Sequence, residues 1–288
     1  MNSVIFLLFL QSFLPLQDPP DQVFKKVESS VVAIRSLAPL GERSGTGVII
    51  DPAGVILTSY SVVPQGAKNI RVWTTTPGKY GDAKILGTSK KDEISLIQIS
   101  PKKPLSPISF GKSGRIRIGD VSYSVGNAAN SIILDNQPSF QIGIISGIYN
   151  LREPRANSTY RGVVLETSSA VNVGMEGAPL LDKTGRMIGF ITLNYSPNRF
   201  LGCAIPIDGQ RFIIDLLRKK SKGTEDSNPT DADLGVVVQE GKEGLLIVKV
   251  LSGSSAEHAG LEKGDILTGI GKQPLRKPED LHKALEGL

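Results

Sequence analysis

Short apolar runs separated by turn residues occupy most of the chain, from Val31 to about Pro206. The runs are rich in β-branched residues, and Gly, Pro, Asn or Ser stands between them, as in SVVAIRS, TGVIIDPAGVILTS, SLIQIS, GDVSYSVG and MIGFITLN. Runs of this length at such intervals predict an all-β barrel or sandwich. Among them, DPAG at 51–54 stands between two apolar runs and predicts a hairpin turn by its own chemistry.

The pattern changes after this region. Residues 208–220, DGQRFIIDLLRKK, place apolar side chains at helical spacing and end in basic residues, which predicts a helix that closes the domain. The polar stretch at 221–233 has no apolar periodicity and predicts a linker. A second module is expected from Leu234, with strands in LGVVVQ, LLIVKVL and DILTGIG and with helices at 255–259 and 278–285.

The first seventeen residues carry no charged side chain and contain the apolar run VIFLLFLQSFLPL at 4–16. The run is shorter than the roughly 20 apolar residues that cross a bilayer, and it matches the apolar region of an export signal. We interpret residues 1–17 as a signal peptide. An uncleaved membrane anchor is the second interpretation and a buried core helix the third.

Composition narrows the choice of function. The net charge of +5 is spread along the chain, and no basic run is longer than 218–220, so nucleic acid is not expected as a partner. The single cysteine, Cys203, excludes a disulfide within the chain, and its apolar neighbours predict a buried, inert thiol. Because His and Cys do not cluster and the acidic residues lack ligand spacing, we expect neither a metal nor another cofactor.

Several motifs stand in one order along the chain, namely TGVIIDPAGVILTS, ISLIQI, GDVSYSVGN, QIGIISGI, GMEGAPLLDKTGRMIGFIT and GCAIPI. Together they resemble the HtrA/Deg trypsin-like serine proteases, and GSSAEHAGLEKGDILTGIGKQPL with PEDLHKAL resembles the PDZ domain that follows the protease domain in that family. The resemblance runs from about Val23 to Leu288. It implies a mainly β fold, with a trypsin-like double β-barrel at 23–220 and a PDZ domain at 234–288. It also implies export to the periplasm or cell envelope, handling of unfolded or damaged polypeptides, and a homotrimer.

The same resemblance assigns three catalytic positions, and none holds the family's residue. The position of the catalytic histidine, after the strand and turn matching VILTSYSVV, is Ser61. The aspartate position before ISLIQI is Glu93, or Asp92 if the register shifts by one residue. The nucleophilic serine of GNSGGPL is replaced in GMEGAPL by Glu176, with Gly174, Met175 and Glu176 at the backbone positions of the oxyanion hole.

Elementary chemistry points the same way. A serine attacks an amide only when a positioned base takes its proton, and both histidines, His258 and His282, lie in the second module. A carboxylate at 176 would repel a developing oxyanion or fill its site. Glu93 and Glu176 could instead form an acid and base pair, but nothing else in the barrel supports a sugar or metal site. We therefore expect Glu176 to be a turn residue whose carboxylate is bonded by backbone N–H groups or a basic side chain.

The second module has its own candidate site. By resemblance to PDZ domains, an extended peptide end adds to the strand near Leu234, opposite the helix at 278–285. The residues expected to line this groove, with core packing as the alternative, are Leu234, Gly235, Val236, Val238, Leu281 and Leu285. The family's module continues for about two strands beyond this helix, so we expect a module that is truncated, unstable or completed by a partner.

Three functions remain. The first is a catalytically inactive HtrA-like protein of the envelope, with or without a membrane anchor. It would bind unfolded polypeptides or protein C-termini as a chaperone, scaffold or regulator of an active relative. The second is an active serine endopeptidase of protein quality control. The third is a structural envelope protein without a peptide ligand.

Overall fold

The computed structural model describes residues 19–75, 79–80, 83–151, 160–192, 202–221, 234–250, 256, 259–271 and 273–286. The expected signal peptide and nearly all of the expected linker lie outside these residues, as does most of the short helix predicted at 255–259. Within the described part, no helix is long and apolar enough to cross a membrane. The mainly β architecture predicted from the apolar pattern is confirmed.

Seven strands form the first sheet, in the order β5-β4-β1-β2-β3-β7-β6, with neighbours antiparallel. The sheet curls so that its two ends meet. Ala83, just before β6, donates a backbone hydrogen bond of 3.1 Å to the carbonyl of Ile70 in β4. The strands are β1 (Val31–Ala38), β2 (Gly41–Asp51), β3 (Val55–Ser59), β4 (Lys68–Thr74), β5 (Lys79–Tyr80), β6 (Lys84–Ser89) and β7 (Ile94–Gln98).

The hairpin predicted at DPAG is confirmed between β2 and β3. The Asp51 carboxylate accepts the N–H of Ala53 at 2.8 Å, and the Asp51 carbonyl accepts that of Gly54 at 2.9 Å. Gly54 has φ +90°, a conformation that glycine adopts without steric cost.

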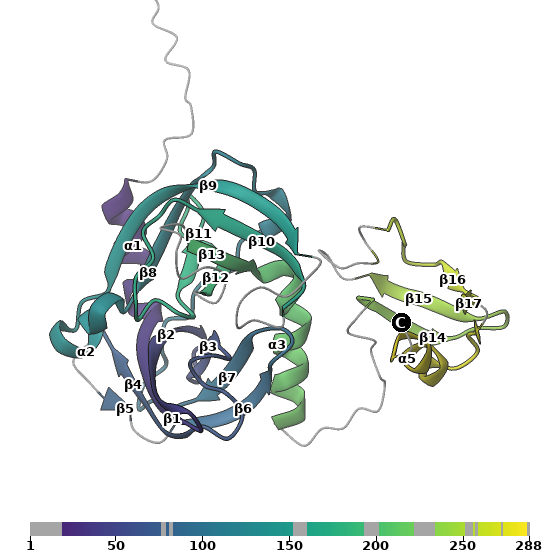
Figure 1. The fold of residues 1–288 in the computed structure, drawn as a ribbon, viewed down its shortest axis with the longest axis horizontal. Helices are drawn as coiled ribbons and strands as arrows, with labels where there is room; N and C mark the ends of the chain where they lie inside the picture. Colours follow the sequence, from purple (N-terminus) through teal and green to yellow (C-terminus); the bar gives the residue numbers. More distant parts are fainter. Residues whose placement is uncertain are drawn as a thin grey trace, which may run out of the picture.

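Six strands close into a barrel in the order β10-β13-β12-β11-β8-β9 (Figure 1). The barrel interior holds its own apolar cluster, which includes Ile145, Leu165 and Leu180. The strands are β8 (Val121–Gly126), β9 (Ser139–Leu151), β10 (Gly162–Thr167), β11 (Pro179–Leu181), β12 (Met187–Thr192) and β13 (Gly202–Pro206).

Another apolar cluster joins the first sheet to the barrel. It combines first-sheet residues such as Val31 and Leu57 with Tyr123 and Phe190 of the barrel. Strand β1 is therefore buried on both faces over its first half, since Val32 packs into the separate cluster of the first sheet. Cys203 packs against the joining cluster but is half-buried, so the predicted burial of its thiol is only partial.

Helices cover the outside of these sheets. The helix predicted at 208–220 is confirmed as α3, which contacts β6, β7 and β12 and thus runs along both sheets (Figure 1). The helical elements of this part are α1 (Pro20–Val27), η1 (Glu28–Ser30), η2 (Ser113–Arg115), η3 (Ala128–Asn130), α2 (Ser131–Asp135) and α3 (Ile207–Ser221).

The second module has a separate apolar core, which includes Val236, Leu245, Ile247 and Leu281. The predicted strands and the last helix are confirmed, with the sheet order β14-β15-β16 and a small β17-β18 pair. Their bounds are β14 (Val236–Glu240), β15 (Leu245–Val250), β16 (Ile266–Leu267), β17 (Gly269–Ile270), β18 (Gln273–Pro274) and α5 (Pro278–Glu286).

Candidate functional site

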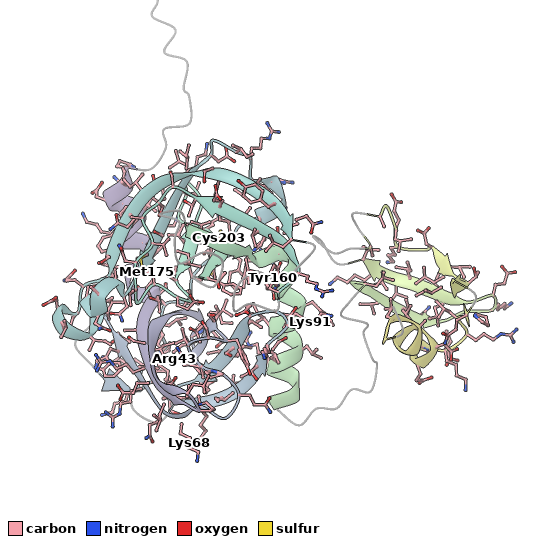
Figure 2. All side chains as sticks on the ribbon, in the orientation of Figure 1. Arg43, Lys68, Lys91, Tyr160, Met175 and Cys203 are labelled. Atoms are coloured by element: carbon pink, nitrogen blue, oxygen red, sulfur yellow. The ribbon has the colours of Figure 1, made fainter. Side chains whose placement is uncertain are left out.

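The site is built on the turn at 172–178, which enters β11. Gly174 and Gly177 have φ of +96° and +83°, and a Cβ at either position would overlap a backbone oxygen, of Asn127 and of Thr46 respectively. Only glycine meets both requirements. The Met175 side chain between them is fully buried in the barrel core (Figure 2).

Thr46 of β2 holds this turn from the first sheet. Its N–H donates to the Glu176 carbonyl at 2.8 Å, and its hydroxyl donates to the Gly174 carbonyl at 2.7 Å. The same hydroxyl accepts the N–H of Asn127 at 2.9 Å. One threonine thus joins the first sheet, the turn and the end of β8.

The Glu176 carboxylate is buried among serine hydroxyls. Its Oε1 accepts hydrogen bonds from the hydroxyls of Ser59 and Ser61, each at 2.8 Å, and these two hydroxyls lie 2.8 Å from one another. Glu176 is 7% exposed and Ser59 is fully buried. The carboxylate is bonded as expected of a turn residue, and the two hydroxyl donors come from the end of β3 and the turn that follows it.

Glu93 lies next to the same segment. It is 3% exposed, adopts φ 57°, and its carbonyl accepts the N–H of Tyr60 at 2.9 Å. Asp92, the alternative in the shifted register, is bonded to the Ser89 hydroxyl. The backbone of Glu93 therefore lies beside the segment that leads to Ser61, and the Asp92 carboxylate is bonded within its own turn.

The backbone of the turn fixes the direction of one N–H at a predicted oxyanion-hole position. The Val173 carbonyl accepts the N–H of Ala129 at 2.9 Å. Because a trans peptide is planar, the Gly174 N–H points to the opposite side of that peptide. Ala129 itself adopts φ 50°, in the left-handed region.

Sequence reasoning missed four contributors, Thr46, Ser59, Asn127 and Ala129. Ser59 carried a usable signal, because it stands two residues before Ser61. The other three are joined to the turn by contacts between residues far apart in the sequence, for which a single chain offers no pattern.

Comparison with known proteins decides the family. The trypsin-like peptidase domain family matches residues 45–190, and the PDZ domain family matches residues 246–288. The chain belongs to the HtrA/Deg family. The predicted fold, a trypsin-like domain followed by a PDZ domain, is thereby confirmed.

Relatives of this HtrA/Deg chain are named as proteases. It is 30% identical to protease Do-like 1, chloroplastic, of Arabidopsis thaliana, over 92% of this chain and 65% of the relative. It is 29% identical to the periplasmic pH-dependent serine endoprotease DegQ of Escherichia coli, over 85% and 54%, and 26% identical to the serine protease PepD of Mycobacterium tuberculosis, over 92% and 60%. The chain thus spans between half and two thirds of the length of these relatives.

Two of the positions that the HtrA/Deg pattern assigns to catalysis meet through their side chains, and the third lies next to them along the backbone. Ser61 and Glu176 are in hydrogen-bond contact, and Glu93 adjoins Tyr60. What they can do chemically is limited, since a serine hydroxyl is no base near neutral pH and a carboxylate occupies the nucleophile position. Among the described residues, no group of His, Cys, Asp and Glu could hold a metal ion.

The PDZ groove residues divide into two sets. Val236, Val238 and Leu281 are at most 5% exposed and pack in the module core, which favours the core-packing interpretation for them. Leu234 and Leu285 are half-buried against that core, and Gly235 adopts φ +75°. The backbone edge of β14 is not paired with any described strand other than β15, and α5 contacts β14. The His282 side chain lies outside the described residues.

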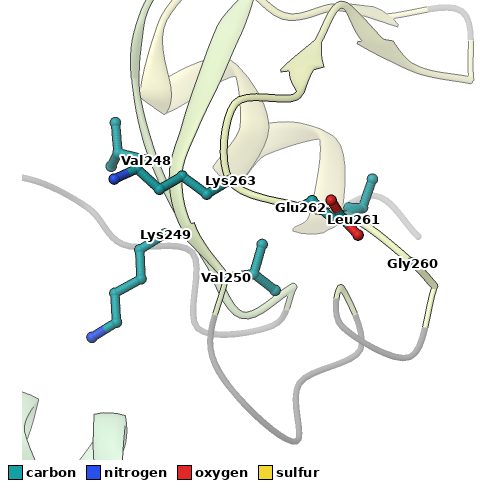
Figure 3. Close-up of a pocket in the computed structure, with 7 residues that line it drawn as sticks. All are labelled: Val248, Lys249, Val250, Gly260, Leu261, Glu262 and Lys263. Carbon is teal, nitrogen blue, oxygen red and sulfur yellow. The ribbon is translucent and has the colours of Figure 1, made fainter.

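A hollow of about 620 Å³ lies elsewhere on this module (Figure 3). None of the predicted groove residues borders it. Its lining comes from the end of β15 and the segment before β16, namely Val248, Lys249, Val250, Gly260, Leu261, Glu262 and Lys263.

Proposed function

We propose that the chain is a catalytically inactive HtrA-like protein of the cell envelope that binds polypeptides as a chaperone, scaffold or regulator of an active relative. One observation carries the proposal: the residue in the nucleophile position, Glu176, is an acceptor whose donor is the residue in the base position, Ser61, at 2.8 Å. The two groups satisfy each other. Neither position holds the imidazole base or the hydroxyl nucleophile with which a serine protease attacks a peptide bond.

Polypeptide binding is supported by the second module. The open backbone edge of β14 offers the hydrogen-bonding groups that strand addition uses, and half-buried Leu234 and Leu285 offer apolar contact beside it. We propose unfolded polypeptides and protein C-termini as ligands. We also propose that the chain forms a homotrimer. An envelope location is supported by relatives named as periplasmic, such as DegQ.

An active endopeptidase of protein quality control is the alternative, because the relatives are named as proteases and the turn keeps its glycines and one oriented N–H. A structural envelope protein without a peptide ligand is the third function.

The deciding experiment compares the purified chain with a Glu176→Ala variant on a denatured, fluorescently labelled protein. We expect no hydrolysis by either and no labelling by a fluorophosphonate. Hydrolysis that persists through purification and is lost in the variant would show an enzyme. A peptide-library screen then separates a binding protein from a structural one, since the latter captures no peptide.

A further inference from the structure

A group of cationic side chains surrounds α1, where the chain enters the described structure. Its members come from α1, from the turn between β11 and β12, and from the segment before η2. They are Lys25, Lys26, Lys112, Lys183 and Arg186, and all five are exposed. We call them the α1 basic surface.

Contacts show that these three segments are neighbours. Lys26 Nζ donates to the Thr184 carbonyl at 3.0 Å, which joins α1 to the β11–β12 turn. The N–H of Gly111, next to Lys112, donates to the Met187 carbonyl at 2.8 Å, and a Cβ at Gly111 would lie 3.3 Å from Cβ of Arg186. The cations therefore form one continuous surface.

Acidic groups only partly offset this charge. Asp21 lies 3.6 Å from Lys25, in a pair that is largely exposed and therefore weak. The Oδ1 of Asp182 is used within its own turn, where it accepts the N–H of Thr184 and of Arg186. In the described part of the chain, Lys112, Lys183 and Arg186 have no ion pair, so the surface keeps an excess of positive charge.

The α1 helix is firmly attached to the barrel. Val23 and Val27 are 0% and 2% exposed, and the Phe24 ring packs edge-on against Phe140 of β9 at 5.4 Å. The barrel segments that carry the other cations are consequently held at a fixed place relative to α1.

The sequence immediately before α1 indicates which side of the molecule would face a membrane. The uncharged apolar run at 4–16 ends four residues before Pro20, a distance of at most about 14 Å in extended chain. The Debye length at physiological salt is about 8 Å. If the run enters a bilayer, the start of α1 is held within about two Debye lengths of it. Clusters of Lys and Arg beside a membrane segment attract anionic lipids.

We propose that the α1 basic surface binds an anionic phospholipid membrane. It would hold the six-stranded barrel against the bilayer through α1, with the turn at 182–186 and Lys112 facing the headgroups. This proposal does not depend on whether the chain is a protease.

The test is flotation of the full chain with phosphatidylcholine vesicles, with or without phosphatidylglycerol, at low and high salt. Binding to pure phosphatidylcholine measures the apolar run alone, and the ratio between the two vesicle types measures the basic surface. We expect the ratio to exceed one, to fall with salt, and to drop in the variant Lys112→Gln/Lys183→Gln/Arg186→Gln. The drop should be about fivefold for each cation, or on the order of 10²-fold for three, at low salt.

A matched variant removes the same charge elsewhere. Lys68, Lys102 and Lys103 are exposed on the first sheet side of the chain, and Lys68→Gln/Lys102→Gln/Lys103→Gln should leave the ratio within about twofold of the unmodified chain. Melting curves check that both variants fold. Equal binding to the two vesicle types, or an equal loss in both variants, would overturn the proposal.

Discussion

Exchanging the long and short side chains at positions 61 and 176 should build a serine nucleophile with its base. At present Glu176 reaches Ser61 across 2.8 Å. The same number of bonds separates Cβ from Oε1 in glutamate and Cβ from Nε2 in histidine. The variant Ser61→His/Glu176→Ser therefore keeps the summed reach of the two side chains. It places an imidazole nitrogen within hydrogen-bond distance of a hydroxyl.

The size of the expected gain follows from the role of the base. A positioned general base contributes about 10²–10⁴-fold to the rate, so the double variant should hydrolyse an unfolded protein at least about 10²-fold faster than Glu176→Ser alone. The hydroxyl introduced at 176 would lie beside the retained Gly174 N–H, and removal of the carboxylate frees that region for an oxyanion. Adding Glu93→Asp should raise the rate again, because the family's carboxylate orients the imidazole.

The assay is release of fluorescent peptide from a denatured labelled substrate, with fluorophosphonate labelling at position 176 located by mass spectrometry. Ser61→His and Glu176→Ser serve as single controls. A double variant that melts cooperatively yet is neither labelled nor faster than Glu176→Ser would refute the argument from side-chain reach.

Three further changes test the structure. Gln210 is 4% exposed and its Oε1 has no hydrogen-bond partner among the described residues, which costs about 1–3 kcal/mol, so Gln210→Met should raise the free energy of unfolding in urea by about 1 kcal/mol. Gly174→Ala should lower it by more than about 2 kcal/mol, since the methyl group overlaps the Asn127 carbonyl at a positive φ; an unchanged urea midpoint would contradict the turn geometry. Because Leu281 is fully buried, the groove is better tested at half-buried Leu234, where Leu234→Ser should weaken binding of an apolar C-terminal peptide about tenfold by fluorescence anisotropy, and equal affinity would exclude this groove.

Local chemistry made part of this fold predictable. The Asp51–Gly54 turn, the apolar face of α3 and the strands of both modules follow from residues close together in the sequence. The contact of Thr46 with Gly174 does not, because it joins residues 128 positions apart and depends on how two sheets meet. The catalytic positions were located only through family resemblance. Their hydrogen bonds required the packed structure.

The departures at 61 and 176 behave as one unit rather than two. Ser61→His alone would place a second long side chain opposite Glu176, and such overpacking costs about 1–3 kcal/mol. Glu176→Ser alone would remove the carboxylate acceptor of both Ser59 and Ser61, and the loss of these hydrogen bonds costs stability. Each single change therefore destabilises, whereas the double change restores one long and one short side chain. A double-mutant cycle in urea should give a coupling energy of about 0.5–3 kcal/mol in favour of the pair. Additive effects would mean that the two side chains do not depend on each other, and the mutual satisfaction on which the proposal of inactivity rests would then be wrong.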